Sequence, residues 1–135
     1  MALITTISTK ELERVASLAY EGETLKVMLC NVGASGFNAQ STVADWQSVE
    51  LPSANGYVRY SEVIGTGSYS VPDGRYNLPT IDAQFTATGA GYSYTRVVLY
   101  IDGATYPHSI ISEDLGLTLL AGQVQTYRLI LVNDD

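Results

Sequence analysis

Strict alternation of apolar and polar residues over positions 80–88 is the clearest structural signal in the chain. In this segment, TIDAQFTAT, the two residue classes separate completely when every second position is taken. Successive side chains of a β-strand point to opposite faces of the sheet, so the segment predicts a half-buried strand. The predicted apolar face carries Ile81, Ala83, Phe85 and Ala87, and the polar face carries Asp82, Gln84, Thr86 and Thr88.

A second alternating segment, YSYTRVVLYI at 92–101, follows after the break Gly89-Ala90-Gly91. Simple alternation predicts two faces for this strand as well. One face would carry Thr95, Val97, Leu99 and Ile101, and the other Tyr94, Arg96, Val98 and Tyr100. Asp102-Gly103 comes next and is a strong signal for a tight hairpin.

Further strand-like segments, separated by glycine, proline and asparagine, occupy most of the remaining chain. They lie at 24–32, 45–51, 57–64, 67–71, 75–78, 105–111, 116–122 and 125–132. Asn55-Gly56 and Pro72-Asp73-Gly74 predict turns, and the small, polar stretch 32–43 predicts the longest loop. A spacing of about ten residues indicates antiparallel strands rather than βαβ units. We therefore predict a mainly β protein, an antiparallel β-sandwich that is jelly-roll-like, with one short N-terminal α-helix.

The N-terminal helix is predicted over residues 9–20. Ser8 and Glu11 form a capping box, in which each side chain bonds a backbone N–H of the first turn. An apolar stripe at helical spacing follows, and Gly22 ends it. The stripe consists of Leu12, Val15, Ala16 and Ala19. The predicted organisation is an N-terminal arm and helix at 1–22, followed by a single β-sandwich domain at 23–135.

Composition and charge narrow the classes of partner. The 135 residues carry a net charge of -7, and only 16% of them are charged. Two lysines and five arginines form no basic run, so we expect no nucleic-acid or anionic-membrane partner. A membrane-spanning helix needs about 20 apolar residues, and no apolar run in the sequence is that long. The first residues do not resemble a signal peptide. The single cysteine, Cys30, is expected to be a small buried hydrophobe.

Candidate catalytic groups are sparse. His108 is the only histidine, and its neighbour Ser109 would face the opposite way if both lay in one strand. One histidine and one cysteine are too few for a zinc site, and no glycine motif joins a strand to a helix as a phosphate loop requires. Asp45, Asp73 and Asp102 lie in or beside predicted turns. We therefore expect no enzyme activity and no catalytic, metal-binding or cofactor-binding residues.

Tyrosine is the unusual component, with ten residues beside two phenylalanines and one tryptophan. Tyrosine is enriched at protein interfaces, although it also favours strands for ordinary packing reasons. Trp46 is expected in the core. Leu3, Ile4 and Ile7, which precede the predicted helix at 9–20, could form an arm onto a neighbouring subunit or pack under that helix. The candidate partner-interface residues are Leu3, Ile4, Ile7, Tyr69, Tyr76, Tyr94, Arg96 and Tyr100.

Three short segments carry a resemblance to a known class of protein. They are GYVR at 56–59, TRVVLYIDG at 95–103 and LLAGQVQTY at 119–127. In this order the chain resembles the small β-rich virion proteins of tailed bacteriophages, which include capsid cement or decoration proteins and minor tail proteins. The resemblance implies a central strand and hairpin at the second segment and entry to the last strand at the third. It implies no catalytic residues.

The resemblance and the residue analysis lead to one expectation. The protein would be a non-enzymatic virion structural protein, first a capsid cement or decoration protein and second a tail, neck or fibre component. Its partners would be the major capsid protein or other virion proteins, and it would form a dimer or trimer. It would be assembled in the host cytoplasm and located in the virion, without a cofactor. A carbohydrate-binding, lectin-like module is the main alternative, and a glycosidase is a distant third.

Overall fold

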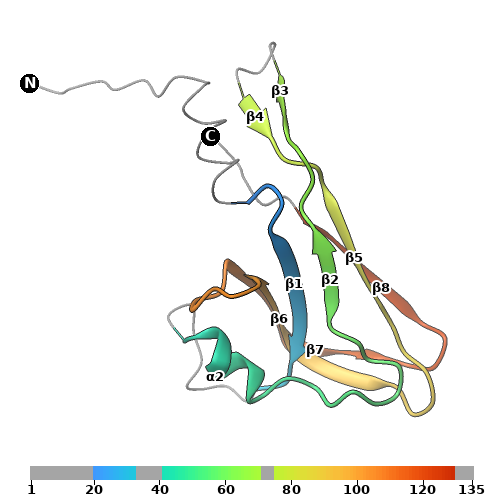
Figure 1. The fold of residues 1–135 in the computed structure, drawn as a ribbon. Coiled ribbons are helices and arrows are strands. Elements are labelled where there is room, and N and C mark those ends of the chain that lie inside the picture. Colours follow the sequence, from blue (N-terminus) through green and yellow to red (C-terminus); the bar gives the residue numbers. More distant parts are fainter. Residues whose placement is uncertain (1–19, 33–40, 71–74, 130–135) are drawn as a thin grey trace, which may run out of the picture.

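In the computed structural model, residues 20–32, 41–70 and 75–129 are described, and they form a mainly β structure of antiparallel strands (Figure 1). Helix α2 lies between the first and second strands in sequence. The elements are β1 (Thr24–Cys30), α2 (Val43–Gln47), β2 (Tyr60–Val63), β3 (Ser68–Ser70), β4 (Arg75–Asn77), β5 (Ile81–Thr86), β6 (Tyr92–Ile101), β7 (Ser109–Leu119) and β8 (Val124–Leu129).

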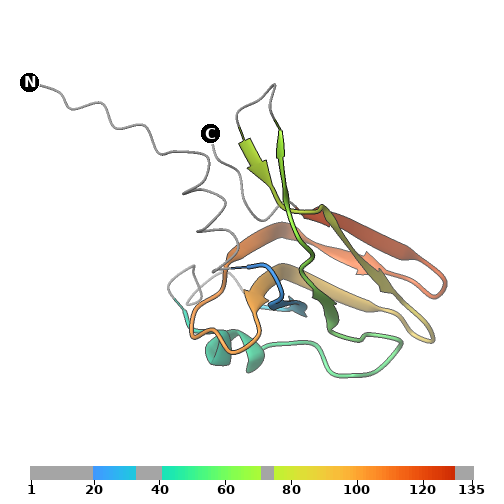
Figure 2. The ribbon, with the colours of Figure 1, turned by 45° about the horizontal axis from the view of Figure 1, so that its top comes forward.

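The strands form three sheets. Four strands pair in the order β2-β1-β6-β7, β5 pairs with β8, and β3 pairs with β4. Every pairing is antiparallel. Figure 2 shows the β3–β4 pair extending away from the other strands.

The strands β5 to β8 form one two-stranded ribbon that folds over at a corner. The pair β6–β7 lies in the four-stranded sheet, and the pair β5–β8 forms the opposing sheet. Between them the ladder continues, because Ala87 N–H donates to Gln123 O (3.0 Å) and Gly122 N–H donates to Ala87 O (2.8 Å). At the corner Gly91 has φ +74°, and a Cβ there would lie 2.2 Å from Leu119 O. Only glycine, which has no Cβ, lets the backbone at position 91 come this close to the backbone at Leu119.

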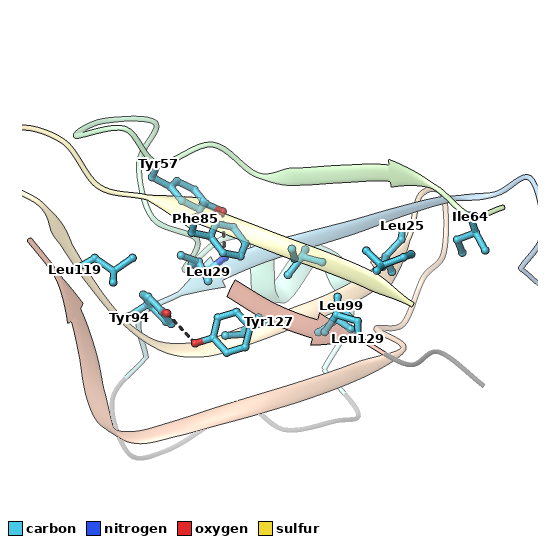
Figure 3. Close-up of a cluster of buried hydrophobic side chains, with 14 of the residues drawn as sticks. Leu25, Leu29, Tyr57, Ile64, Phe85, Tyr94, Leu99, Leu119, Tyr127 and Leu129 are labelled. Atoms are coloured by element: carbon cyan, nitrogen blue, oxygen red, sulfur yellow. Dashed lines mark hydrogen bonds between the residues drawn. The ribbon is translucent and has the colours of Figure 1, made fainter. Parts of the chain in front are cut away.

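The main core lies between the four-stranded sheet and the β5–β8 pair, and Figure 3 shows its larger side chains. The predicted alternation of residues 80–88 is confirmed, because the apolar face is buried and the polar face is exposed. Side chains from both sheets therefore pack together in one core. The main core consists of Leu25, Val27, Leu29, Tyr57, Ile64, Leu78, Ile81, Ala83, Phe85, Ala87, Tyr94, Val97, Leu99, Leu119, Tyr127 and Leu129.

A second core lies on the other face of the four-stranded sheet, beneath α2. Trp46 and Cys30 are both fully buried there, so the predictions for these two residues are confirmed. Val32, Val49 and Ile110 pack at its margin. The second core consists of Met28, Cys30, Val43, Trp46, Val98 and Tyr100.

The prediction of a strand at 45–51 is wrong, because part of this segment forms α2. Thr42 Oγ1 accepts from Asp45 N–H (3.1 Å), and the Asp45 carboxylate accepts from Thr42 N–H (3.0 Å). This capping box satisfies backbone donors of the first turn and favours a helix locally. Val43 and Trp46, three positions apart, then lie on one buried side.

The predicted faces of 92–101 are wrong at Tyr94, because the β6–β7 ladder shifts register between Tyr94 and Arg96. Tyr94 pairs with Leu117 and Arg96 with Ser112, so an irregularity at Thr95 interrupts the alternation. Tyr94 consequently joins Val97 and Leu99 in the main core. Thr95 Oγ1 instead accepts from Val32 N–H (3.0 Å) and donates to Val32 O (3.1 Å).

The turn predictions have different outcomes. Asn55-Gly56 is confirmed as a turn, with φ values of 55° and 86° and a Tyr57 N–H to Ala54 O bond of 3.1 Å. Asp102-Gly103 also turns the chain, but seven residues separate β6 from β7, so the tight hairpin is wrong. Strand β7 joins two segments predicted as separate. The predicted turn at 72–74 and the predicted helix at 9–20 lie outside the described residues, except Tyr20, which lies in a turn.

Candidate interaction surface

The predicted interface residues occupy several separate places. Tyr94 is 0% exposed in the main core, and Tyr100 is 3% exposed in the second core on the opposite face of the sheet. Arg96 is half-buried and donates from Nη1 to Thr95 O (2.8 Å). These three residues therefore form no common exposed face.

The other predicted interface residues lie elsewhere in the chain. Tyr69 of β3 stands directly opposite Tyr76 of β4 in the register of the outlying pair. Leu3, Ile4 and Ile7 lie outside the described residues. A role for these positions in partner binding stays a prediction.

Most of the tyrosines whose side chains are described serve internal packing. Tyr57, Tyr94, Tyr100 and Tyr127 are buried, whereas Tyr106 is 58% exposed. Three further tyrosines are half-buried, namely Tyr20, Tyr60 and Tyr92. The high tyrosine content therefore reflects strand packing more than an aromatic surface.

A hydrogen-bonded chain of phenols crosses the main core. The hydroxyl oxygens of Tyr94 and Tyr127 are 2.7 Å apart, and Tyr127 donates to Glu113 Oε1 (3.2 Å), so Tyr94 donates to Tyr127 (Figure 3). Burial raises the pKa of Tyr127 to about 12, although the bond from Tyr94 lowers it. Burial and the bond to Tyr127 also raise the pKa of Tyr94. Both phenols are therefore neutral near pH 7. Their mutual hydrogen bond gives each buried hydroxyl group a partner, which is a structural role.

A second polar cluster joins the segment after α2 to the four-stranded sheet. Tyr57 Oη donates to Glu50 Oε2 (2.5 Å) and accepts from Leu29 N–H (3.1 Å). Arg59 binds both oxygens of the same carboxylate, with Nε 3.0 Å from Oε2. Its guanidinium carbon lies 5.9 Å from the Tyr100 ring centroid. This bidentate geometry gives a well-defined structural clamp.

The electrostatics of this cluster also indicate a structural role. The hydrogen bond to Glu50 raises the pKa of Arg59, while burial opposes that shift. Burial is the largest cause of the raised pKa of Tyr57, with the bond to Glu50 second. The sequence analysis did not predict this cluster. The Asn55-Gly56 turn lies between Glu50 and Arg59 in the sequence and reverses the chain, so it was a signal that these two residues could meet.

The groups considered for catalysis lie in unreactive or exposed settings. Burial raises the pKa of Cys30 to about 12, and its thiol donates to Trp46 O (3.4 Å), so it is a poor nucleophile. His108 Nδ1 lies 3.1 Å from Ser109 Oγ. The expectation of opposite directions applied to neighbours within one strand, and His108 precedes β7, which begins at Ser109. Its ring also packs edge-on against Tyr20, with centroids 5.7 Å apart.

No group of three or more histidine, cysteine, aspartate or glutamate side chains is placed to hold a metal ion within residues 20–32, 41–70 and 75–129. Over the same ranges, no helix has the length and apolar character needed to cross a membrane.

A groove lies where α2 meets the loop between β6 and β7. Val43 N–H donates to Thr105 O (2.8 Å), which fixes the loop against the start of the helix. Gly103 has no side chain and those of Ala44 and Ala104 are small, which leaves space there, and the groove has a volume of about 360 Å³. It is lined by Val43, Ala44, Gln47, Tyr100, Asp102, Gly103, Ala104 and Thr105.

Large apolar side chains are exposed on or beside outer strands of the sheets. Strand β2 is an edge of the four-stranded sheet, and its last residue, Val63, is 62% exposed. Val58, just before β2, is 72% exposed. Leu120 and Val124 are 59% and 53% exposed at the corner between β7 and β8. Open edges that carry apolar side chains are suited to pairing with another chain.

Comparison of the chain with protein-family models, with curated proteins and with solved structures gave no match in any of the three. A function for this chain is therefore inferred from the geometry of the described residues and from the resemblance of the three sequence segments.

Proposed function

We propose that this protein is a non-enzymatic structural component of a tailed-bacteriophage virion, and that it acts as a capsid cement or decoration protein. We further propose that its two facing sheets are a β-sandwich with jelly-roll-like connections. The folded ribbon of β5 to β8 supports this finer description, because nested strand pairs divided between two sheets are typical of that architecture. The partner would be the major capsid protein or another virion protein.

The observation that carries the proposal is the exposed apolar edge around β2. Val63, the last residue of β2, and Val58, which precedes the strand, are both more than half exposed, and β2 is an edge of the four-stranded sheet. Natural β proteins usually protect such edges, because unpaired backbone groups promote association. A protein that adds to a repeating lattice would use this edge as an attachment site, and many copies would bind with avidity.

The chemistry of the interior supports a binding role over catalysis. The carboxylate of Glu50 is held by Tyr57 and Arg59, and that of Glu113 accepts from Tyr127. These acids stabilise the fold through specific partners. The buried thiol of Cys30 is held in its protonated form.

The lectin-like alternative receives less support from the aromatic residues. Trp46 is fully buried, and Tyr100 is 3% exposed, so neither ring offers a platform on which a sugar could stack. A tail, neck or fibre position would use the same exposed edge as a capsid position. It is therefore an outcome of the experiment below.

Co-sedimentation with purified particles tests the proposal. The protein should bind capsids that lack it, and light scattering should report a dimer or trimer in solution. Val63→Lys should abolish binding, because a charge on the edge opposes strand pairing. The control, Gln84→Lys, places the same charge on the exposed face of β5 and should bind normally. Binding to tails alone would move the assignment there, and binding to defined glycans without particle binding would overturn it.

A further inference from the structure

We propose that the groove between α2 and the 102–105 loop is a socket for a lysine or arginine side chain presented by a loop of the protein partner. This inference deepens the proposed function, on which it rests for the identity of the partner. The socket is separate from the exposed apolar edge around β2 and would supply a directional polar contact beside it.

The walls of the groove suit the stem of a long cationic side chain. Val43 and Tyr100, nearly buried, form its deeper part, and the exposed Ala44 and Ala104 lie at its sides. Lysine and arginine bury their methylene stems on such apolar surface while the charged end remains at a polar group. The volume of about 360 Å³ falls within the range of small-ligand sites and accommodates one side chain with its solvent.

The charge of the groove fits a cation. Asp102 contributes an exposed carboxylate at the rim, and Gln47 and Thr105 add neutral oxygen acceptors. Within the described part of the chain, no ion pair joins Asp102 to a lysine or arginine. The whole protein carries a net charge of -7, so its field also attracts basic partners.

The backbone holds these groups in a fixed arrangement. Asp102 N–H donates to Thr24 O (2.9 Å), and Ala104 N–H donates to Ile101 O (2.9 Å), which closes the turn at Gly103. With the Val43–Thr105 bond, both walls are anchored to β1 or α2. A preorganised socket loses less entropy on binding than a mobile loop.

The aromatic floor argues against a sugar as the occupant. Tyr100 is 3% exposed, and the Arg59 guanidinium lies over its ring, so the ring face is not available for stacking. The groove therefore presents an acid and apolar walls without an aromatic platform, which favours a cationic side chain over a pyranose.

Amide NMR of the isotope-labelled protein tests the socket directly. The probes are N-acetyl-lysine amide and N-acetyl-arginine amide, with the neutral Nε-acetylated lysine compound as the control. Affinity on the order of millimolar is expected for such fragments. The amide signals of Ala44, Gln47 and residues 103–105 should shift with the cationic probes, and added salt should reduce the shifts. Equal shifts with the neutral compound, or none with either cation, would overturn the proposal.

Matched variants separate the socket from nonspecific charge effects. Asp102→Asn should weaken binding about fivefold, the size of an exposed ion pair. Asp82→Asn removes one exposed carboxylate on β5 and should have no effect. Ala44→Leu should fill the groove and reduce binding, whereas Ala121→Leu, at an exposed turn residue, should not.

The particle assay distinguishes failure of the socket from failure of the proposed function. Particle binding that Asp102→Asn leaves unchanged, together with silent probes, would reject the socket and retain the function. Probe binding at the groove without binding to any virion component would retain the socket and reject the function.

Discussion

The main core and the second core are closed in different ways. Hydrogen-bonded strands cover the main core on both sides, from the four-stranded sheet and from β5–β8. The second core is covered by α2, a helix of five residues held by one capping box. A folded protein opens locally where its core is covered by the fewest stable contacts. The α2 side should therefore open at a lower free energy than the ribbon of β5 to β8. The proposed socket lies on the α2 side, where backbone hydrogen bonds to β1 and α2 hold its walls.

The largest expected effect is in the main core. Phe85→Ala should lower the free energy of unfolding by about 3–5 kcal/mol, because it leaves a cavity between two sheets that cannot collapse. Urea denaturation followed by circular dichroism measures it. Phe85→Leu should cost clearly less, and an alanine variant as stable as the leucine variant would contradict a closely packed interior.

Trp46→Ala should cost about 3 kcal/mol, at the lower end of the range for a buried aromatic, because a short helix can settle into the space. The variant should also expose Cys30, whose thiol donates to Trp46 O. Labelling by a thiol reagent in native buffer should therefore accelerate more than in Phe85→Ala. Faster labelling in the Phe85 variant would reverse the proposed order of the two cores.

Tyr94→Phe should lower the free energy of unfolding by about 1–2 kcal/mol, because it removes the donor to Tyr127 from a buried pair. A thermal melt measures the change. Tyr106→Phe is the control, since this side chain is 58% exposed and should alter stability by less than about 0.5 kcal/mol. A double variant with Tyr127→Phe should be less destabilised than the sum of the two single changes.

Thr42→Ala should cost about 1 kcal/mol by removing the N-cap of α2. Hydrogen exchange should show faster opening over 43–47 with little change in β5 and β8. Thr42→Ser keeps the accepting oxygen and should retain most of the protection. Uniform loss of protection over all strands would show that the second core does not open independently.

Alkaline pH should destabilise both cores, with no effect near neutrality. Cys30 has its pKa raised from 9.0 to about 12, and Tyr127 from 10.0 to about 12. Because the folded state holds these protons more tightly, their contribution is complete below the unfolded pKa values and is lost between about pH 9 and 12. Denaturant titrations should show Cys30→Ala flattening the first part of this decline, between about pH 9 and 10.

The sequence predicted structure best where one local rule operated alone. Alternation at 80–88 gave both faces of β5 correctly, because no irregularity interrupts that strand. The same rule misplaced Tyr94, since the irregularity at Thr95 depends on the distant segment β7 and on Val32. The helix α2 was missed although its capping box, Thr42 and Asp45, is local, because the apolar spacing of 45–51 also suits a strand.

The candidate site was harder to predict than the fold. The groove combines α2 with the loop after β6, and only the folded chain brings these segments together. The clamp of Glu50, Tyr57 and Arg59 likewise depends on how the Asn55-Gly56 turn packs. Residue type alone suggested that tyrosine would mark a surface, whereas tertiary packing placed Tyr94 and Tyr100 inside.

The position of Trp46 has a spectroscopic consequence. It is the only tryptophan in the chain, and it lies in the second core rather than between the sheets. Intrinsic fluorescence will therefore monitor the environment beneath α2, and its emission should shift to longer wavelength when that region hydrates. Occupation of the neighbouring groove should perturb the same emission, which provides a label-free optical signal for ligands at this end of the molecule.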